Sequence, residues 1–220
     1  MAEFAYFVAW LAVMSEGRAE HWQNVYRTKE PTAVSWFRPH LEVSLELIKQ
    51  TGVNANSCII DVGAGASTLV DDLLKLGFLH LTAFDISATS LDVAKQRLGT
   101  RANAVRWIVG DVASHRFPRN GFDVWHDRAV LHFLVASHDV QCYVENATTS
   151  IVNGGHVVIG CFASDGPEKC SGLPVTRRDP EDIAALFGAS FTVIAARREQ
   201  HMTPTQATQS FAYALLRKRA

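Results

Sequence analysis

The stretch Ile60-Asp-Val-Gly-Ala-Gly-Ala-Ser-Thr68 decides the fold, because it reads as the end of a buried strand, a glycine turn and the start of a helix. The strand is predicted over residues 58–62 and the helix over residues 67–76. Gly63 and Gly65 permit a tight turn and let a ligand approach the backbone closely. A turn of this kind predicts a nucleotide-type ligand site, although a plain strand-to-helix turn has the same spacing.

On both sides of this stretch, short apolar runs alternate with helical patterns. Strands are expected over residues 81–86, 105–109, 122–125 and 156–162, and helices over residues 41–50, 87–98, 129–135, 140–152 and 180–187. Such alternation implies a parallel sheet with helices on both faces. Two final strands, 191–196 and 211–216, have no helical pattern between them, which favours an antiparallel pair. The predicted fold is a single α/β domain with a doubly wound, Rossmann-like sheet and a ligand site at the carboxyl ends of its strands.

Composition places the chain among ordinary globular proteins. It has 220 residues, of which 48% are hydrophobic and 20% are charged, enough for one large domain with a substantial core. The formal net charge is −1. A balanced charge provides no electrostatic field for non-specific nucleic-acid binding, so no nucleic-acid partner is predicted.

The cysteines and the N-terminal segment indicate the cellular compartment of the protein. The four cysteines form no C-x-x-C pair and no zinc-site spacing, which predicts reduced thiols, a cytoplasmic protein and no metal. Residues Phe4–Met14 form an apolar run of about 11 residues, shorter than the roughly 20 that span a bilayer, so no membrane association is expected. The run is interpreted as a helix docked on the body or on a partner, or as an extension upstream of a start at Met14. The oligomeric state is not indicated.

Three carboxylates that follow successive predicted strands indicate the type of ligand. Asp61 lies just before Gly63, where it would repel a pyrophosphate but would suit a cofactor that carries an amino group. Asp85 ends the second strand, where a carboxylate can accept hydrogen bonds from both ribose hydroxyls. Asp111 follows the third strand and could accept from an adenine amino group, with the backbone N–H of Val112 beside it. The set predicts S-adenosylmethionine, a cationic adenosine cofactor without phosphates.

Two other functions use a similar sheet. An NAD-type Rossmann oxidoreductase would have Gly or Ala where this chain has Thr68, and it would not favour an acid at position 61. A non-catalytic module that keeps the cofactor pocket only as a scaffold would carry the same acids. Both remain alternatives to a methyltransferase.

At the level of motifs, the chain resembles class I S-adenosylmethionine-dependent methyltransferases. The resemblance rests on D-x-G-x-G at residues 61–65, F-D-I-S at 84–87, V-G-D-V at 109–112 and a Gly154-Gly155 turn before a strand, and it extends from Leu41 to the C-terminus. It implies seven strands in the order 3-2-1-4-5-7-6, with the last strand antiparallel. Ser67 stands where the family often has a third glycine. The cofactor contacts expected within this domain are Asp61, Gly63, Gly65, Asp85, Ile86, Asp111, Val112 and His126.

The N-terminal region resembles a narrower group. Its His21-Trp22-Gln-Asn-Val-Tyr26 and following Trp36 are similar to the arm of methyltransferases related to the lysine methyltransferases of elongation factor 1A and of citrate synthase. The resemblance implies that residues 1–40 form an arm over the cofactor, with Trp22, Tyr26 and Trp36 as contacts, and that residues 41–220 form the methyltransferase domain. The alternative is that these aromatic side chains cap an apolar edge of the sheet.

The chemistry is expected where the fourth strand ends. His126, Asp127 and Arg128 form a polar cluster between two apolar runs, and they are the candidate catalytic residues. His126 could take a proton from the nucleophile, and Arg128 could lower a thiol's pKa or hold a carboxylate. The alternative is an Asp–Arg pair that fixes the loop. Cys170 and His201 are candidate substrate contacts, and the acceptor is predicted to be a small thiol, chalcogen or carboxylate, or a protein lysine.

Overall fold

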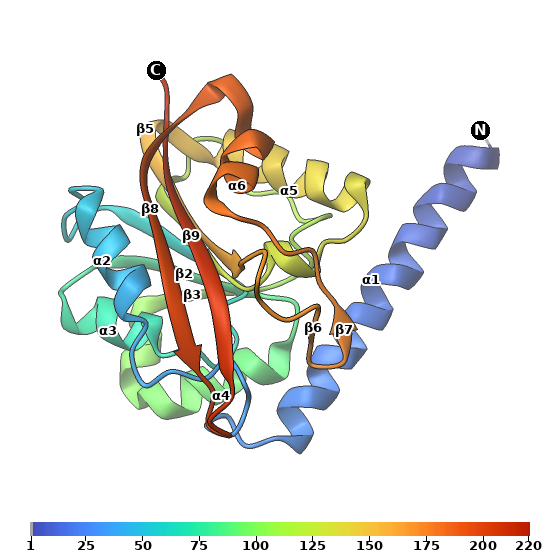
Figure 1. The fold of residues 1–220 in the computed structure, drawn as a ribbon, viewed down its shortest axis with the longest axis horizontal. Coiled ribbons are helices and arrows are strands. Elements are labelled where there is room, and N and C mark those ends of the chain that lie inside the picture. The colour runs from blue at the N-terminus through green and yellow to red at the C-terminus, as the bar shows by residue number, and fades with distance from the viewer. Residues whose placement is uncertain (1) are drawn as a thin grey trace.

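Strands and helices alternate from residue 42 to residue 109, as Figure 1 shows, and strands follow one another directly within residues 105–128, 151–174 and 191–218. The computed structural model describes the backbone of residues 2–220 and the side chains of residues 15–220. The elements are α1 (Ala2–Thr28), α2 (Glu42–Gln50), β1 (Cys58–Val62), α3 (Leu69–Lys75), β2 (His80–Asp85), α4 (Ala88–Leu98), the 3₁₀ helix η1 (Gly99–Ala104), β3 (Val105–Val109), β4 (Phe122–Arg128), the 3₁₀ helix η2 (Leu131–Phe133), α5 (Ser137–Ser150), β5 (Ile151–Phe162), β6 (Lys169–Cys170), β7 (Leu173–Pro174), α6 (Pro180–Phe187), the 3₁₀ helix η3 (Gly188–Ser190), β8 (Phe191–Met202) and β9 (Thr208–Lys218).

Seven of these strands form one sheet in the order β3-β2-β1-β4-β5-β9-β8. Strands β3, β2, β1, β4 and β5 run parallel, and β9 runs antiparallel to both of its neighbours, β5 and β8. Strands β6 and β7, of two residues each, pair only with each other in a separate hairpin. In chain order, β9 is therefore the seventh strand of the main sheet. The predicted Rossmann-like fold, its strand order and the antiparallel terminal pair are confirmed.

Several strands are longer than predicted. Strand β4 continues to Arg128, so the cluster expected in the following loop forms the end of the strand, where His126 pairs with Asp61 of β1. Strand β5 begins at Ile151 rather than after the glycine pair, with a register shift against β4. The predicted helix over 129–135 is reduced to the single turn η2. The polar residues of β4 remain in the ladder because neighbouring strands satisfy their backbone groups.

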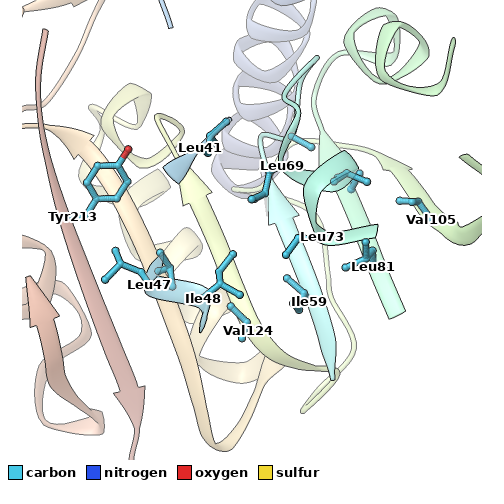
Figure 2. Close-up of a cluster of buried hydrophobic side chains, with 14 of the residues drawn as sticks. Leu41, Leu47, Ile48, Ile59, Leu69, Leu73, Leu81, Val105, Val124 and Tyr213 are labelled. Atoms are coloured by element: carbon cyan, nitrogen blue, oxygen red, sulfur yellow. The ribbon is translucent and has the colours of Figure 1, made fainter. Parts of the chain in front are cut away.

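The core fills both faces of the sheet. On one face, Leu47 and Ile48 of α2 belong to the same buried cluster as Ile59 of β1 and Val124 of β4 (Figure 2). On the other face, Trp125 of β4 belongs to a second buried cluster, which includes residues of α5 and α6. Since successive strand residues point to opposite faces, β4 sends His126 and Arg128 to the α2 face and Asp127 to the α5 face.

Local signals in the sequence fix the starts of two helices. The hydroxyl of Ser87 caps α4 by accepting from the backbone N–H of Ser90 at 3.2 Å, as the sequence predicts. Asp179 and Asp182 form a capping box at the start of α6.

Helix α1 lies along the outside of the domain, near the β6–β7 hairpin (Figure 1). The docking predicted for Phe4–Met14 concerns side chains outside the described residues. Among the described helices, none is both long enough and apolar enough to cross a membrane.

Candidate functional site

A cavity opens at the carboxyl ends of the parallel strands, where a doubly wound sheet binds its ligands. Segments far apart in the chain line it: α1, the loop before α2, the turns after β1, β2, β3 and β4, and the β6–β7 hairpin. The lining residues are Arg18, Trp22, Tyr26, Trp36, Val62, Gly63, Phe84, Asp85, Ile86, Gly110, Asp111, Val112, Arg128, Ala129, Val130, Phe133, Leu134 and Cys170. The cavity thus gathers most of the residues that the sequence singled out.

The glycine turn after β1 is tightly covered. Gly63 and Gly65 both have positive φ angles, of 69° and 52°. A Cβ at Gly63 would lie 1.9 Å from Cγ2 of Val130, and one at Gly65 would lie 2.5 Å from Oη of Tyr26. The turn is tied to β2, since the N–H groups of Gly63 and Ala64 both donate to the carbonyl of Phe84. Only glycine fits at both positions, because of the backbone angle and of the space.

Asp85 lies at the end of β2, buried beside this turn. Its Oδ2 accepts from the N–H of Gly65 at 2.8 Å, and its Oδ1 accepts from the N–H of Ser87 at 2.7 Å. Burial raises the pKa of Asp85 to about 6, against the effect of these backbone hydrogen bonds. Each carboxylate oxygen keeps a free lone pair, so both can accept from a ligand as well.

Helix α1 contacts Asp111 through Arg18. One guanidinium nitrogen donates to Oδ2 of Asp111 at 2.7 Å, and another donates to Oδ2 of Asp139 at the start of α5. The second oxygen of Asp111 accepts from the N–H of Ala113 at 3.0 Å. A residue of α1 thus lies on a carboxylate that the sequence assigned to the adenine ring.

Replacing Arg18 by glutamine is expected to loosen α1 from the domain, since it removes two charge-assisted hydrogen bonds. We expect faster amide hydrogen exchange in residues 18–28 and a loss of about 1–2 kcal/mol in the free energy of unfolding. Arg27→Gln is the matched control, because Arg27 is exposed on the same helix and, among the described residues, its side chain donates to the carbonyl of Gln23 on that helix. Equal exchange in the two variants would rule out an anchoring role for Arg18.

Asp61, His126 and Ser44 form a buried chain of hydrogen bonds. Nδ1 of His126 lies 2.7 Å from Oδ1 of Asp61, and its Nε2 lies 2.8 Å from Oγ of Ser44. All three residues are at most 4% exposed. In the tautomer that satisfies both contacts, Nδ1–H donates to Asp61 and Nε2 accepts from the serine. Both ring nitrogens of His126 are therefore engaged, and Asp61 is oriented by its partner.

Asp127 lies on the opposite face of β4 and holds the following turn. Its two oxygens accept from the backbone N–H groups of Val130 at 2.8 Å and Leu131 at 3.0 Å, and Oδ2 also accepts from the hydroxyl of Tyr143 at 2.7 Å. It is fully buried, and burial raises its pKa to about 6. Asp127 thus fixes the turn after β4, as the structural alternative expects, but it does so through backbone N–H groups and Tyr143, while Arg128 points to the opposite face of the strand.

Arg128 joins the cavity to the terminal strand pair. Its Nε donates to the hydroxyl of Tyr213 at 2.9 Å, and its Nη1 donates to the carbonyl of Trp36 at 3.0 Å. Tyr213 in turn donates to Glu199 at 2.7 Å, and the guanidinium stacks on Phe211 at 4.4 Å from the ring centroid. The loop that carries Trp36 is thus held by side chains of β4 and β9.

Aromatic rings form one wall of the cavity. Trp22 lies 5.7 Å from Trp36 and 5.0 Å from Phe133, centroid to centroid, in edge-to-face geometry. Tyr26 lies 6.3 Å from Trp36. These separations are in the range of favourable aromatic pairs, and the exposed ring faces can contact a cation or a planar ring.

The two candidate substrate residues differ in position. Cys170 lines the cavity from β6, but burial raises the pKa of its thiol to about 12. His201 is fully buried and is not among the lining residues of this cavity. Its Nε2 lies 2.7 Å from the carbonyl oxygen of Ser35. His201 therefore holds the loop that carries Trp36, from outside this cavity.

Sequence reasoning missed four residues that shape the site. They are Arg18, Gln23, Arg38 and Ser44. The oxygen of Gln23 accepts from the hydroxyl of Ser87 and from the N–H of Thr89, both at 3.0 Å, which ties α1 to the start of α4. The spacing of Arg18, four residues before Trp22, places both on one helix face and could have revealed it. No local pattern marks the others.

Comparisons with known proteins agree with this geometry. Residues 60–159 match the family model of a methyltransferase domain. The eEF1A lysine and N-terminal methyltransferase of Mus musculus is 24% identical over 123 residues, which are 56% of this chain and 17% of that protein. The chain thus spans only about a sixth of that relative's length.

Solved structures share the fold. The N-methyltransferase NodS from Bradyrhizobium japonicum WM9, in complex with S-adenosylhomocysteine, is 17% identical with a TM-score of 0.70, covering 91% of this chain and 99% of its own. Burkholderia thailandensis 1,6-didemethyltoxoflavin-N1-methyltransferase, also with S-adenosylhomocysteine, is 20% identical with a TM-score of 0.68, covering 96% and 90%. The resemblance to class I methyltransferases is confirmed, and both of these solved proteins are in complex with S-adenosylhomocysteine.

Proposed function

We propose that this chain, which has the class I S-adenosylmethionine-dependent methyltransferase fold, transfers the methyl group of that cofactor to a small-molecule acceptor. The observation that carries the proposal is the convergence of Asp61, Asp85 and Asp111 with the glycine turn around two adjoining cavities. When bound, the cofactor supplies a sulfonium methyl group that is already activated for transfer.

The residues present fit this cofactor. Oδ2 of Asp61 is buried and has no hydrogen-bond partner among the described side chains, as an oxygen that awaits an amino group would be. The space over Gly63 and Gly65 admits no Cβ. Asp85 would hold the ribose, with Ile86 beside it, while Asp111 and Val112 would hold the adenine. Residues 1–40 would act as the arm, with Trp22, Tyr26 and Trp36 over the domain of residues 41–220.

The residues of β4 would position rather than exchange protons. His126 would orient Asp61, because both of its ring nitrogens already have partners. Asp127 would hold Val130 against the glycine turn. Arg128 touches the cavity itself and would place its positive charge beside the acceptor. The chain's contribution to the rate would then be alignment of the nucleophile with the methyl carbon and exclusion of water.

The acceptor that best suits the part of the cavity around Arg128 is a small anion. Arg128 lies beside Cys170, Trp36 and Phe133 in the cavity lining, so a cation and aromatic rings meet there. A positive charge favours the thiolate form of a thiol and also pairs with a carboxylate. Arg128 would hold such an anion in line with the methyl group that the bound cofactor would supply.

A protein lysine is the second candidate acceptor. The ring cluster of Trp22, Trp36 and Phe133 could contact a substrate ammonium through cation–π interactions. The Mus musculus relative, by its name, acts on a lysine and an N-terminus of eEF1A. Incubation with labelled cofactor, with a cell lysate or with a panel of small thiols, separates the candidates by whether label enters protein or a small product.

Replacing Asp85 by alanine is expected to weaken binding of S-adenosylhomocysteine by at least about 10-fold, because two charge-assisted hydrogen bonds to the ribose are lost. Isothermal titration calorimetry measures the change. Asp92→Ala is the control, since Asp92 bonds to Lys95 on α4, away from the cavity lining. Absence of binding to the unmodified protein at millimolar ligand would refute the proposed function.

A further inference from the structure

Arg128 belongs to a row of register partners that crosses the sheet. It pairs with Gly160 of β5, and Gly160 pairs with Tyr213 of β9. Paired residues of neighbouring strands point to the same face, and two strand spacings place the backbones of Arg128 and Tyr213 about 10 Å apart. The two side chains therefore meet by extending over the middle strand, where Nε of Arg128 donates to the hydroxyl of Tyr213 at 2.9 Å.

Gly160 leaves the space for this contact. A Cβ at position 160 would lie 2.4 Å from Cε1 of Tyr213, closer than side-chain carbons approach one another. A larger residue there would push the tyrosine ring away from Arg128. Tyr213 is 1% exposed and belongs to the buried cluster on the α2 face of the sheet (Figure 2). The ring is thus held by packing as well as by its hydroxyl group.

Glu199 of β8 completes the support. The hydroxyl of Tyr213 donates to Oε2 of Glu199 at 2.7 Å, and burial raises the pKa of Tyr213, so the hydroxyl keeps its proton. The same carboxylate oxygen lies 3.9 Å from Nη2 of Arg128, beyond hydrogen-bond distance, and the other lies 3.6 Å from Nε of Arg38. Glu199 therefore acts on Arg128 through the tyrosine rather than through a direct hydrogen bond.

One nitrogen of the Arg128 guanidinium has no partner. Its Nε donates to Tyr213, its Nη1 donates to the carbonyl of Trp36, and the ring of Phe211 lies 4.4 Å from its central carbon. Nη2 is buried and has no hydrogen-bond partner within residues 15–220, whereas native proteins pair nearly all such donors. Because Arg128 lines the first cavity, a ligand bound there can accept from Nη2.

The neighbours of Arg128 in the cavity lining specify the rest of this ligand. Phe133 and Leu134 line the same cavity, and Trp22 lies edge-to-face on Phe133 at 5.0 Å. Burial raises the pKa of Cys170 to about 12, so its thiol adds no charge to this wall. Aromatic and aliphatic side chains suit a flat apolar body, and a guanidinium nitrogen suits an anionic oxygen or sulfur.

We propose that Arg128 forms an anion subsite for an aromatic carboxylate or thiolate that accepts the methyl group. Tyr213, Glu199 and Gly160 are then positioning residues, because they direct Nη2 of the arginine and do not line the cavity themselves. The proposal rests on the proposed function and deepens it. It assigns the choice of acceptor to strands β5, β8 and β9, none of which contributes a residue to the cavity lining.

Two pairs of probes with matched shapes test the subsite in the unmodified protein. Benzoate is compared with benzamide, and thiophenolate, kept ionised in mildly alkaline buffer, is compared with phenol. Each probe is titrated calorimetrically into protein saturated with S-adenosylhomocysteine. We expect the anion of at least one pair to bind at least about 10-fold more tightly than its neutral partner, as a charge-assisted hydrogen bond implies.

The pattern of binding decides between the outcomes. A preference in the first pair alone assigns a carboxylate acceptor, and a preference in the second alone assigns a thiolate. No preference in either pair would overturn the inference and leave the proposed function standing. If S-adenosylhomocysteine itself fails to bind, the proposed function is refuted, and the same pairs titrated into the free protein then decide whether Arg128 binds an anion.

Variants separate positioning from charge. Arg128→Gln should abolish the preference for the anion. Tyr213→Phe removes the hydroxyl but keeps the ring and the charges of Arg128 and Glu199, so a fall in the preference of at least about 3-fold would come from positioning. Gly160→Ala should also lower the preference, because the added methyl group displaces the ring, and it covers the case in which Tyr213→Phe does not fold. An unchanged preference in both variants would overturn the positioning roles.

Two substitutions of Glu199 complete the test. Glu199→Leu removes the acceptor of the Tyr213 hydroxyl and should lower the preference for the anion, although it also removes a negative charge. Glu199→Gln keeps an oxygen that can accept from Tyr213, so the preference should stay at least as high as in the unmodified protein. Equal losses in the two variants would contradict positioning through the tyrosine. Glu46→Gln is the matched control, because Glu46 pairs with Arg197 at the surface.

Discussion

Replacing Asp127 by alanine is expected to lower the free energy of unfolding by about 3–5 kcal/mol, the largest loss we expect from any single substitution in the site. The carboxylate accepts from two backbone N–H groups and from the hydroxyl of Tyr143, and it is fully buried. Its removal leaves three donors unpaired, two of them buried, and frees the turn that carries Val130. Chemical denaturation near pH 7.5 measures the loss.

Asp123→Ala is the matched control on the same strand. Asp123 accepts one hydrogen bond, from the N–H of Cys58 at 2.7 Å, and it is partly exposed. Its replacement should cost only about 1 kcal/mol. If the two variants lose equal stability, the Asp127 network does not hold the turn. If Asp127→Ala leaves stability unchanged but abolishes turnover, Asp127 acts in the chemistry instead.

The second large effect is a pH dependence caused by His132. Burial lowers the pKa of its imidazole to about 3, and the nearby Arg128 and Arg178 act in the same direction. In the unfolded chain the pKa of His132 is about 6.5. Below that pH the unfolded state binds a proton at His132, and the folded state does not. Stability should therefore fall as pH falls from about 6.5 towards 3, by about 1.4 kcal/mol per pH unit.

The comparison with His132→Asn isolates this contribution. The asparagine oxygen can replace Nδ1 as the acceptor of the N–H of Phe162, and it does not titrate. Between about pH 7.5 and pH 4.5, the wild type should lose about 3 kcal/mol relative to the variant. Asp85 and Asp127, whose raised pKa values act in the opposite direction, are present in both proteins and cancel in the difference. Parallel pH profiles would show that His132 is protonated in the folded chain.

Local patterns were sufficient for most of the fold. Strand β1 and the cap of α4 at Ser87 formed where the sequence placed them, since apolar runs, glycines and capping residues act over a few neighbours. Strand ends were less predictable. Strand β4 continues through three polar residues because β1 and β5 supply its hydrogen bonds, and those strands are distant in sequence.

The sequence by itself determined the alternation of strands and helices in the first half of the domain, the glycine turn and the three acids at or just after the strand ends. Each of these depends on residue type and short-range spacing. Only the tertiary structure decided which side chains meet: Ser44 with His126, Arg18 with Asp111, and Arg128 with Tyr213. The physical reason is that burial and hydrogen bonding at these contacts join groups far apart in the chain, so they exist only after the sheet has placed the segments side by side.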